Sequence, residues 1–120
     1  MDNKTTIQDM KNKVKTFCDE RDWEQFHNAK ELAIGIVLES SEILEHFRFK
    51  SEKEIEEMFK DTKKKEEISE EIADTLFGVF RMAQKYDIDL STVFDKKFEK
   101  NAMKYPVDKF KGNNKKYDEL

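Results

Sequence analysis

Apolar residues recur at every third or fourth position along most of the chain, which is the period of one face of an α-helix. The first such stretch predicts a helix from Ile7 to about Asp19, because Thr6 followed by Asp9 is a capping signal at its start. Its buried stripe consists of Ile7, Met10, Val14 and Phe17. Residues 19–27 lose the helical period, and we expect a loop or a short turn of helix there.

A second helix is predicted from Ala29 to Phe47, since Asn28 with Glu31 three residues later is typical of a capping box. Apolar residues cover more than one side of this segment: Leu32, Ala33, Ile34, Ile36, Val37, Leu38, Ile43, Leu44 and Phe47. A helix with two apolar sides in so small a domain indicates that a second subunit covers one of them. Gly35 costs about 1 kcal/mol relative to Ala in mid-helix, and we expect it to permit a close helix crossing.

The middle of the chain predicts one short and one long helix. Ser51 with Glu54 favours the start of the short helix. The mixed charge run Lys60–Glu67 is expected to be a solvated connector, because acidic residues flank its lysines. The long helix is predicted over about Glu66–Lys85, where the helical period returns.

A last helix is predicted over about Thr92–Lys104, with Ser91 as its N-cap and Tyr105-Pro106 as its end. The tail 107–120 is polar and shows no period, so it is expected to be flexible or to lie over a neighbouring subunit. Together these segments predict an all-α, four-helix-bundle-like fold. With 120 residues, one Pro and three Gly, we expect a single domain over residues 1–120.

The net charge and the cysteine content limit which partners and which cellular compartment are expected. The net charge of −4 gives no basic excess of the kind that a nucleic-acid binder carries, so no nucleic acid polymer is expected as a partner. Cys18 is the only cysteine, which excludes a disulfide framework and favours a reducing, cytoplasmic location. No apolar run approaches the roughly 18 residues that span a bilayer, so no membrane association is expected.

Two acidic pairs carry the candidate chemistry. Glu39 and Glu42 are spaced i, i+3 in one predicted helix, and Glu71 and Asp74 have the same spacing in another, so each pair shares a helix face. Apolar residues flank both pairs, and no Lys or Arg stands at the facing stripe positions. Because an unpaired buried carboxylate costs roughly several kcal/mol, the pattern predicts four acids that converge on a divalent cation. The alternative is that these residues belong to the solvated surface of a chain that is 42% charged.

The ligand chemistry favours one class of cation. All-oxygen ligation suits Mg²⁺, or Mn²⁺, rather than zinc, and such sites usually serve phosphate chemistry. A ferritin-like di-iron site would need Glu-x-x-His on two helices, whereas His46 follows Glu42 at i+4 and the segment 66–85 has no His. The chain has no P-loop and no glycine-rich loop, so phosphates would be held by cations and by lysines such as those at 96, 97, 100 and 104.

These motifs, taken together, resemble the MazG-like all-α nucleoside triphosphate pyrophosphohydrolases, and within them the dCTP pyrophosphatase branch. The resemblance is carried by the two acidic pairs, by the string Glu-Arg-Asp-Trp-Glu-Gln-Phe-His over residues 20–27, by Lys97, Asn101 and Tyr105-Pro106, and by residues 116–120. It implies that Glu39, Glu42, Glu71 and Asp74 bind Mg²⁺. It also implies release of a nucleoside monophosphate and pyrophosphate by a dimer or tetramer with sites near subunit contacts.

The same resemblance implies the substrate contacts. Trp23 would stack on the base and His27 would line the pocket. Lys97 and Asn101 match positions that touch phosphate in the wider family, and Tyr105 is a further expected substrate contact. Two further pocket positions depart from the family: Phe49 stands where close relatives carry a second Trp, and Gly78 where they carry a Tyr. Losing a Tyr hydroxyl removes one hydrogen bond, worth about 0.5 to 1.5 kcal/mol, so looser base selectivity is expected.

The sequence therefore predicts a Mg²⁺-dependent hydrolase of nucleoside triphosphates, with dCTP or a related pyrimidine dNTP as substrate. Either Glu42 or Glu45 is a candidate general base, and the residues do not distinguish between them. The alternative function is a non-catalytic helical oligomer with a structural or regulatory divalent-cation site.

Overall fold

The computed structural model describes residues 1–119, and over this range it contains α-helices, 3₁₀ turns and no strand. The predicted all-α fold class is confirmed. The chain forms two compact units, Met1–Asp87 and Ile88–Leu120. The expectation of one domain over residues 1–120 stays a prediction.

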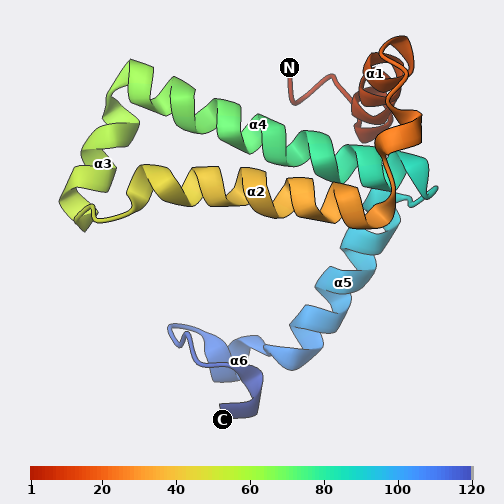
Figure 1. Ribbon diagram of the computed structural model, residues 1–120. Coiled ribbons are helices and arrows are strands. Elements are labelled where there is room, and N and C mark those ends of the chain that lie inside the picture. The colour runs from red at the N-terminus through yellow and green to blue at the C-terminus, as the bar shows by residue number, and fades with distance from the viewer. Residues whose placement is uncertain (120) are drawn as a thin grey trace. The chain divides into compact units, whose positions relative to one another are not determined.

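The first unit is organised around two long helices. It comprises α1 (Ile7–Glu20), a 3₁₀ turn (Glu24–Phe26), α2 (Ala29–Phe47), α3 (Glu52–Lys60) and α4 (Thr62–Lys85). Helices α2 and α4 run side by side in opposite directions, α3 joins them at one end, and α1 packs against α4 at the other end (Figure 1). This arrangement makes the α2–α4 contact the one that positions the acidic pairs.

Side-chain caps fix three of these helix starts. The Thr6 hydroxyl accepts a hydrogen bond from the Asp9 N–H (3.0 Å) and Asp9 accepts one from the Thr6 N–H (2.9 Å). Asn28 Oδ1 accepts from the Glu31 N–H (2.9 Å) at the start of α2, and Ser51 forms a reciprocal capping box at the start of α3. The predicted bounds of the first two helices and the start of the third are confirmed.

The connector predicted over Lys60–Glu67 is wrong, because most of that run is helical. Asp61 separates α3 from α4, and its Oδ1 accepts from the Lys64 N–H (3.0 Å), so α4 begins at Thr62 rather than Glu66. Lys and Glu are strong helix formers, and the Lys64–Glu67 ion pair (3.1 Å) lies along the new first turns. The charged run is thus a solvated helical face.

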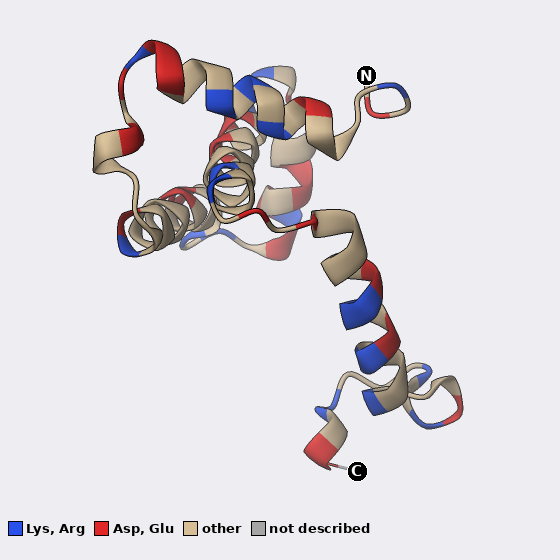
Figure 2. Cartoon of the chain, turned by 90° about the vertical axis from the view of Figure 1, so that its right-hand side faces the viewer, with Lys and Arg blue, Asp and Glu red and all other residues tan. Residues whose placement is uncertain are grey.

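The second unit contains α5 (Leu90–Lys104), α6 (Val107–Phe110) and a 3₁₀ turn (Tyr117–Glu119). Basic and acidic residues alternate along α5 (Figure 2). Its N-cap is Asp89, which accepts from the Thr92 N–H (3.0 Å), rather than the predicted Ser91. Within residues 107–119, where the sequence shows no helical period, the structure has these two short elements. The Tyr105 ring lies 4.8 Å from the ring of Phe110.

The apolar core of the described chain is small. Its buried apolar residues are Val14, Cys18, Leu32, Ile68 and Ala83. By contrast, one side of α2 exposes large apolar side chains, with Val37 at 66% and Leu44 at 65% exposure. Among residues 1–119, no helix combines the length and apolar composition needed to cross a bilayer.

Candidate active site

The close contact between α2 and α4 occurs at Gly78. A Cβ atom at this position would lie 2.7 Å from Cγ1 of Ile36, which only glycine avoids. The close crossing predicted at Gly35 is therefore wrong, since a Cβ there would meet nothing within 4 Å. Because the helices are antiparallel (Figure 1), one turn forward from Ile36 leads to Glu39 while one turn back from Gly78 leads to Asp74.

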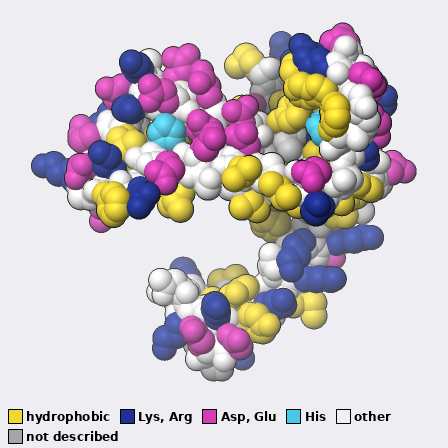
Figure 3. Space-filling model, viewed as in Figure 1, with side chains coloured by type: hydrophobic (Ala, Val, Ile, Leu, Met, Phe, Trp, Pro, Cys, Tyr) yellow, Lys and Arg dark blue, Asp and Glu magenta, His cyan; other side chains and the backbone are white. Residues whose placement is uncertain are grey.

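This register brings three carboxylates together. One carboxylate oxygen from each of Glu39, Glu42 and Glu71 lies within 4.8 Å of the others, so acids from two helices can share one cation. Acidic side chains gather over the paired helices in Figure 3. Glu39 and Glu71 are half-buried, whereas Glu42 is exposed. The predicted convergence of the acidic pairs is thus observed for three of the four residues.

The electrostatics of the cluster favour a bound cation. Oε2 of Glu39 and Oε2 of Glu71 are buried and have no hydrogen-bond partner among the described residues. A side-chain hydrogen bond with Glu42, then burial and the charges of Glu42, Asp74 and Glu39, raise the pKa of Glu71 to about 7. Burial and the charges of Glu42 and Asp74 also raise the pKa of Glu39. A divalent ion would satisfy both unpartnered oxygens and neutralise this repulsion, so the donor set fits Mg²⁺ or Mn²⁺.

Asp74 and Glu45 lie outside the three-carboxylate cluster. Asp74 is exposed, yet its charge contributes to the raised pKa values of Glu39 and Glu71, so it lies close enough to act on both. Glu45 is exposed and its Oε1 lies 3.5 Å from Nη1 of Arg48. Asp74 therefore adds to the negative charge at the cluster, whereas Glu45 is paired with Arg48.

A cavity of about 200 Å³ adjoins the acidic residues between α2 and α4. Its lining consists of His27, Glu31, Leu32, Gly35, Glu39, Asp74, Phe77 and Gly78. Glu39 of the cluster and the nearby Asp74 thus share one cavity with an imidazole and an aromatic ring. A cation bound by the carboxylates could hold the anionic part of a ligand, and the rings could contact an aromatic part. The concave site therefore suits a ligand that has both.

Further aromatic rings support the cavity wall. The Phe17 ring lies edge-on to Phe77 (5.7 Å between centroids) and to Trp23 (5.6 Å), and the Trp23 ring lies 6.1 Å from that of His27. Trp23 is 36% exposed, so part of its ring remains accessible. Base stacking by Trp23 stays a prediction, and the structure places this residue beside the cavity-lining His27.

Comparison with known proteins decides the family. Residues 34–120 match the family model described as the MazG-like family. The chain belongs to the MazG-like family. It is 32% identical over 115 residues to dCTP pyrophosphatase 1 of Rattus norvegicus and 30% identical to that of Homo sapiens, in each case covering 96% of this chain and 68% of the relative. A solved structure of a pyrophosphatase from Archaeoglobus fulgidus superposes with a TM-score of 0.76 and 33% identity, over 82% of this chain and 91% of that one.

Two predicted pocket positions have distinct roles in this MazG-like chain. Gly78 lines the cavity and also provides the close helix contact described above. Phe49 lies just beyond α2, is 89% exposed, and has the positive φ of 62° that a non-glycine residue seldom adopts. Its ring lies 4.6 Å from the guanidinium carbon of Arg48, and it does not line the cavity of its own chain.

Three predicted substrate contacts of the MazG-like chain lie in the second unit: the phosphate contacts Lys97 and Asn101, and Tyr105. Lys97 is exposed on α5, Asn101 is half-buried, and its carbonyl accepts from the Tyr105 N–H (2.8 Å) at the end of the helix. The Tyr105 ring packs on Phe110 and lies 6.0 Å from the Tyr117 ring. Their roles toward phosphate stay predictions.

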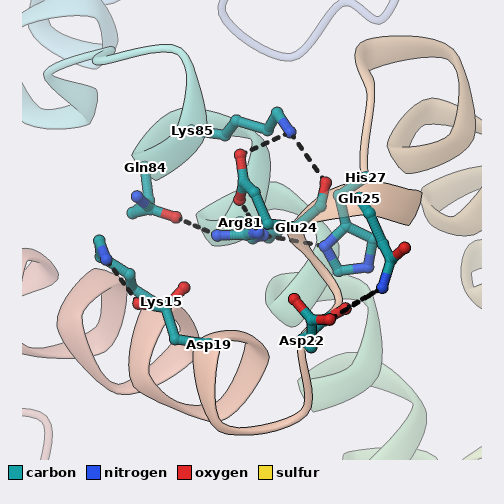
Figure 4. Close-up of polar contacts among 9 residues, drawn as sticks. All are labelled: Lys15, Asp19, Asp22, Glu24, Gln25, His27, Arg81, Gln84 and Lys85. Atoms are coloured by element: carbon teal, nitrogen blue, oxygen red, sulfur yellow. Dashed lines mark hydrogen bonds and ion pairs between the residues drawn. The ribbon is translucent and has the colours of Figure 1, made fainter.

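Arg81, which was not among the residues predicted from the sequence, is 1% exposed. Figure 4 shows its guanidinium between His27, Glu24 and Gln84, all of which it contacts through hydrogen bonds. The signal that could have found it is spacing, because Asp74, Gly78 and Arg81 follow one another at i+4 and i+3 on one face of α4. Arg81 neutralises Glu24 rather than the acidic cluster.

The two glycines of the helix pair give a matched stability test. Gly78→Ala is expected to lower the free energy of unfolding by up to about 2 kcal/mol, because overpacking costs about 1–3 kcal/mol and the gain in helix propensity returns only about 1 kcal/mol. Gly35→Ala is expected to raise it by up to about 1 kcal/mol, since its Cβ meets open space. Urea unfolding of both variants checks this, and equal midpoints would contradict the contact with Ile36.

Proposed function

We propose that this nucleotide pyrophosphatase of the MazG-like family depends on Mg²⁺ and cleaves dCTP, or a related pyrimidine dNTP, to the monophosphate and pyrophosphate. The observation that carries the proposal is the three-carboxylate cluster on α2 and α4, with two unpartnered oxygens, beside a cavity walled by aromatic rings. The relatives named dCTP pyrophosphatase 1 support the choice of base.

The metal would be held by Glu39, Glu42 and Glu71, with Asp74 as the fourth ligand. Bound Mg²⁺, or Mn²⁺ in its place, polarises phosphoryl oxygens and lowers the pKa of a bound water. A hydrogen bond with Glu42, burial and the charges of the neighbouring carboxylates raise the pKa of Glu71. A bound cation would relieve the repulsion among these carboxylates. The hard oxygen donors select such cations over softer metals.

We assign the general base to Glu42 rather than Glu45. Glu42 lies in the cluster and is exposed to solvent, so a water can reach it. Glu45 is engaged by Arg48 outside the cluster. A carboxylate in this position can take a proton from the attacking water, provided that it lies within hydrogen-bond reach.

The nucleoside would occupy the cavity between α2 and α4, with Trp23 and Phe77 supplying aromatic surface and His27 a polar contact. Gly78 lines the same cavity, at the position where the resemblance places a Tyr. Lys97 and Asn101 of α5 are proposed to contact the phosphates. Tyr105, just after α5, is proposed as a further substrate contact, and Phe49 as a second ring. These assignments rest on the resemblance and on the aromatic character of the cavity wall.

We further propose a homo-oligomer, a dimer or tetramer, formed through the apolar face of α2. Four large apolar side chains on this helix are 45% exposed or more: Ile34, Val37, Leu38 and Leu44. An apolar helix face of this kind is typically covered by a partner. Light scattering at micromolar concentration would report the mass, and the mass of one chain would contradict the proposal.

Product analysis tests the reaction. Incubation with a panel of dNTPs and Mg²⁺ is expected to release pyrophosphate and the monophosphate, fastest from dCTP, and to stop when a chelator is added. A pyrimidine preference follows from the relatives, and dATP and dGTP are the matched purine controls. Orthophosphate as the product would indicate a phosphatase. No product from any dNTP would favour the alternative, a non-catalytic helical oligomer whose acids bind a structural or regulatory cation.

A further inference from the structure

Arg81 is a buried cation with a partner for each side-chain nitrogen. Its Nε donates to Nδ1 of His27 (2.9 Å), Nη1 donates to Oε1 of Gln84 (2.6 Å), and Nη2 donates to the Glu24 carboxylate (Figure 4). The other Glu24 oxygen accepts from Nζ of Lys85 (2.8 Å). Because a buried guanidinium is costly unless its donors are satisfied, these bonds fix the plane and position of Arg81.

The bond from Arg81 dictates which nitrogen of His27 carries the proton. Arginine does not lose its proton in proteins, so the Nε–H of Arg81 must donate and Nδ1 of His27 must accept. A neutral imidazole that accepts at Nδ1 carries its hydrogen at Nε2. Burial and the charges of Arg81 and Lys85 lower the pKa of His27, while Glu24 opposes this.

His27 also lines the cavity between α2 and α4, and among the described residues none accepts a hydrogen bond from its Nε2. We infer that Arg81 is a positioning residue that holds His27 as the neutral Nε2–H tautomer, so that the imidazole donates a hydrogen bond to an acceptor atom of the bound nucleoside. The identity of the ligand in this inference rests on the proposed function. The tautomer of His27 does not depend on it. A carbonyl oxygen of a pyrimidine base is the kind of acceptor that such a donor selects.

Nitrogen-15 spectroscopy of the imidazoles reads the tautomer directly. The chain has only two histidines, His27 and His46, so a long-range ¹H–¹⁵N correlation gives two sets of ring signals, and His46→Gln assigns them. At about pH 7, His27 is expected to show a protonated Nε2 and an unprotonated Nδ1. A protonated Nδ1, or signals averaged between the tautomers, would overturn the inference in the wild-type protein itself.

Arg81→Met removes the donor but keeps a side chain of similar reach. The His27 signals are expected to move toward a mixture of tautomers, while those of His46 stay in place. If Arg81 had only a structural role, the variant would lose stability with the His27 tautomer unchanged. Glu24→Gln is the matched control, because its amide oxygen can still accept from Arg81 and the His27 tautomer is expected to persist.

Replacing His27 by Asn or by Gln tests the roles of its two ring nitrogens independently. In His27→Asn the side-chain oxygen takes the place of Nδ1 and accepts from Arg81, but nothing replaces the donor at Nε2. KM for dCTP is therefore expected to rise about threefold to tenfold, with kcat and the unfolding midpoint little changed. In His27→Gln the amide reaches the place of Nε2 and leaves Arg81 Nε without its acceptor, so the unfolding midpoint is expected to fall while KM rises less.

The outcomes distinguish this inference from the proposed function. The imidazole spectra need no substrate, so they test the Arg81–His27 bond even if no dNTP is cleaved. If dCTP is cleaved and His27→Asn leaves KM unchanged, the proposed function stands and the donor role of His27 is wrong. A raised KM of His27→Asn, together with a protonated Nε2 of His27 in the wild type, supports both the inference and the proposed function.

Discussion

Turnover of the Glu39→Gln variant is expected to fall on the order of 10³-fold, because a neutral amide replaces one of the proposed metal ligands. Loss of a group that only hydrogen-bonds to a metal ligand already lowers metal affinity or activity by about 10- to 100-fold. The unfolding midpoint in the absence of metal is expected to change little. Gln keeps the volume of Glu39, and it removes a carboxyl whose pKa is raised by burial and by the charges of Glu42 and Asp74. Steady-state rates and thermal unfolding of the same preparation measure both effects.

The control for this variant is Glu70→Gln. Glu70 is exposed, lies next to Glu71 on α4, and is outside the carboxylate cluster, so its replacement removes the same charge without removing a proposed ligand. Its rate is expected to stay near that of the wild type. Full turnover by Glu39→Gln would discard the metal site, whereas equal losses in both variants would point to net charge instead of ligation.

The second large effect concerns pH and metal removal. The pKa of Glu71 is raised from 4.5 to about 7 in the fold, so the folded state binds its proton more tightly than the unfolded state. Its contribution to stability is therefore fully present below about pH 4.5 and is lost as the pH rises through about 7. In a chelator, the wild type is expected to lose stability over this window relative to Glu71→Gln, which has no proton to lose.

Mg²⁺ is expected to reverse this loss. Below about pH 7 the ion must displace the proton of Glu71, and above it the site is already anionic, so the rise in unfolding midpoint should be larger at about pH 8 than at about pH 6. At a hundredfold excess over Kd, a single ion stabilises by about 2.7 kcal/mol, which corresponds to roughly 10 °C. An equal rise at both pH values, or the same rise in Glu71→Gln, would show that Mg²⁺ binds elsewhere.

The helices were predictable where local side-chain chemistry determines them. Thr6, Asn28 and Ser51 each cap the helix that the sequence assigns to them. The start of α4 was not predicted, because the run Lys60–Glu67 has no apolar stripe to reveal a helix and a single Asp61 provides both the break and the cap. Periodicity detects helices that bury a face, and this first part of α4 buries little.

The acidic site was predictable because its spacing is local, whereas the contacts that align the two helices are not. The i, i+3 pairs place Glu39 with Glu42 and Glu71 with Asp74 on shared faces. Which glycine allows the helices to meet depends on register between them, and the structure selects Gly78 rather than Gly35. The pairing of Arg81 with Glu24 joins residues 57 positions apart, so no local pattern predicts it.

The early start of α4 also affects how firmly the acidic residues are held. Glu71 lies nine residues after Thr62, the first residue of the helix, and therefore more than two turns from an end where backbone hydrogen bonds open most readily. The lysine-rich first turn can fray without unwinding the backbone around Glu71. Substitutions in the first turn of α4 can therefore change its charge without moving the proposed metal ligands Glu71 and Asp74.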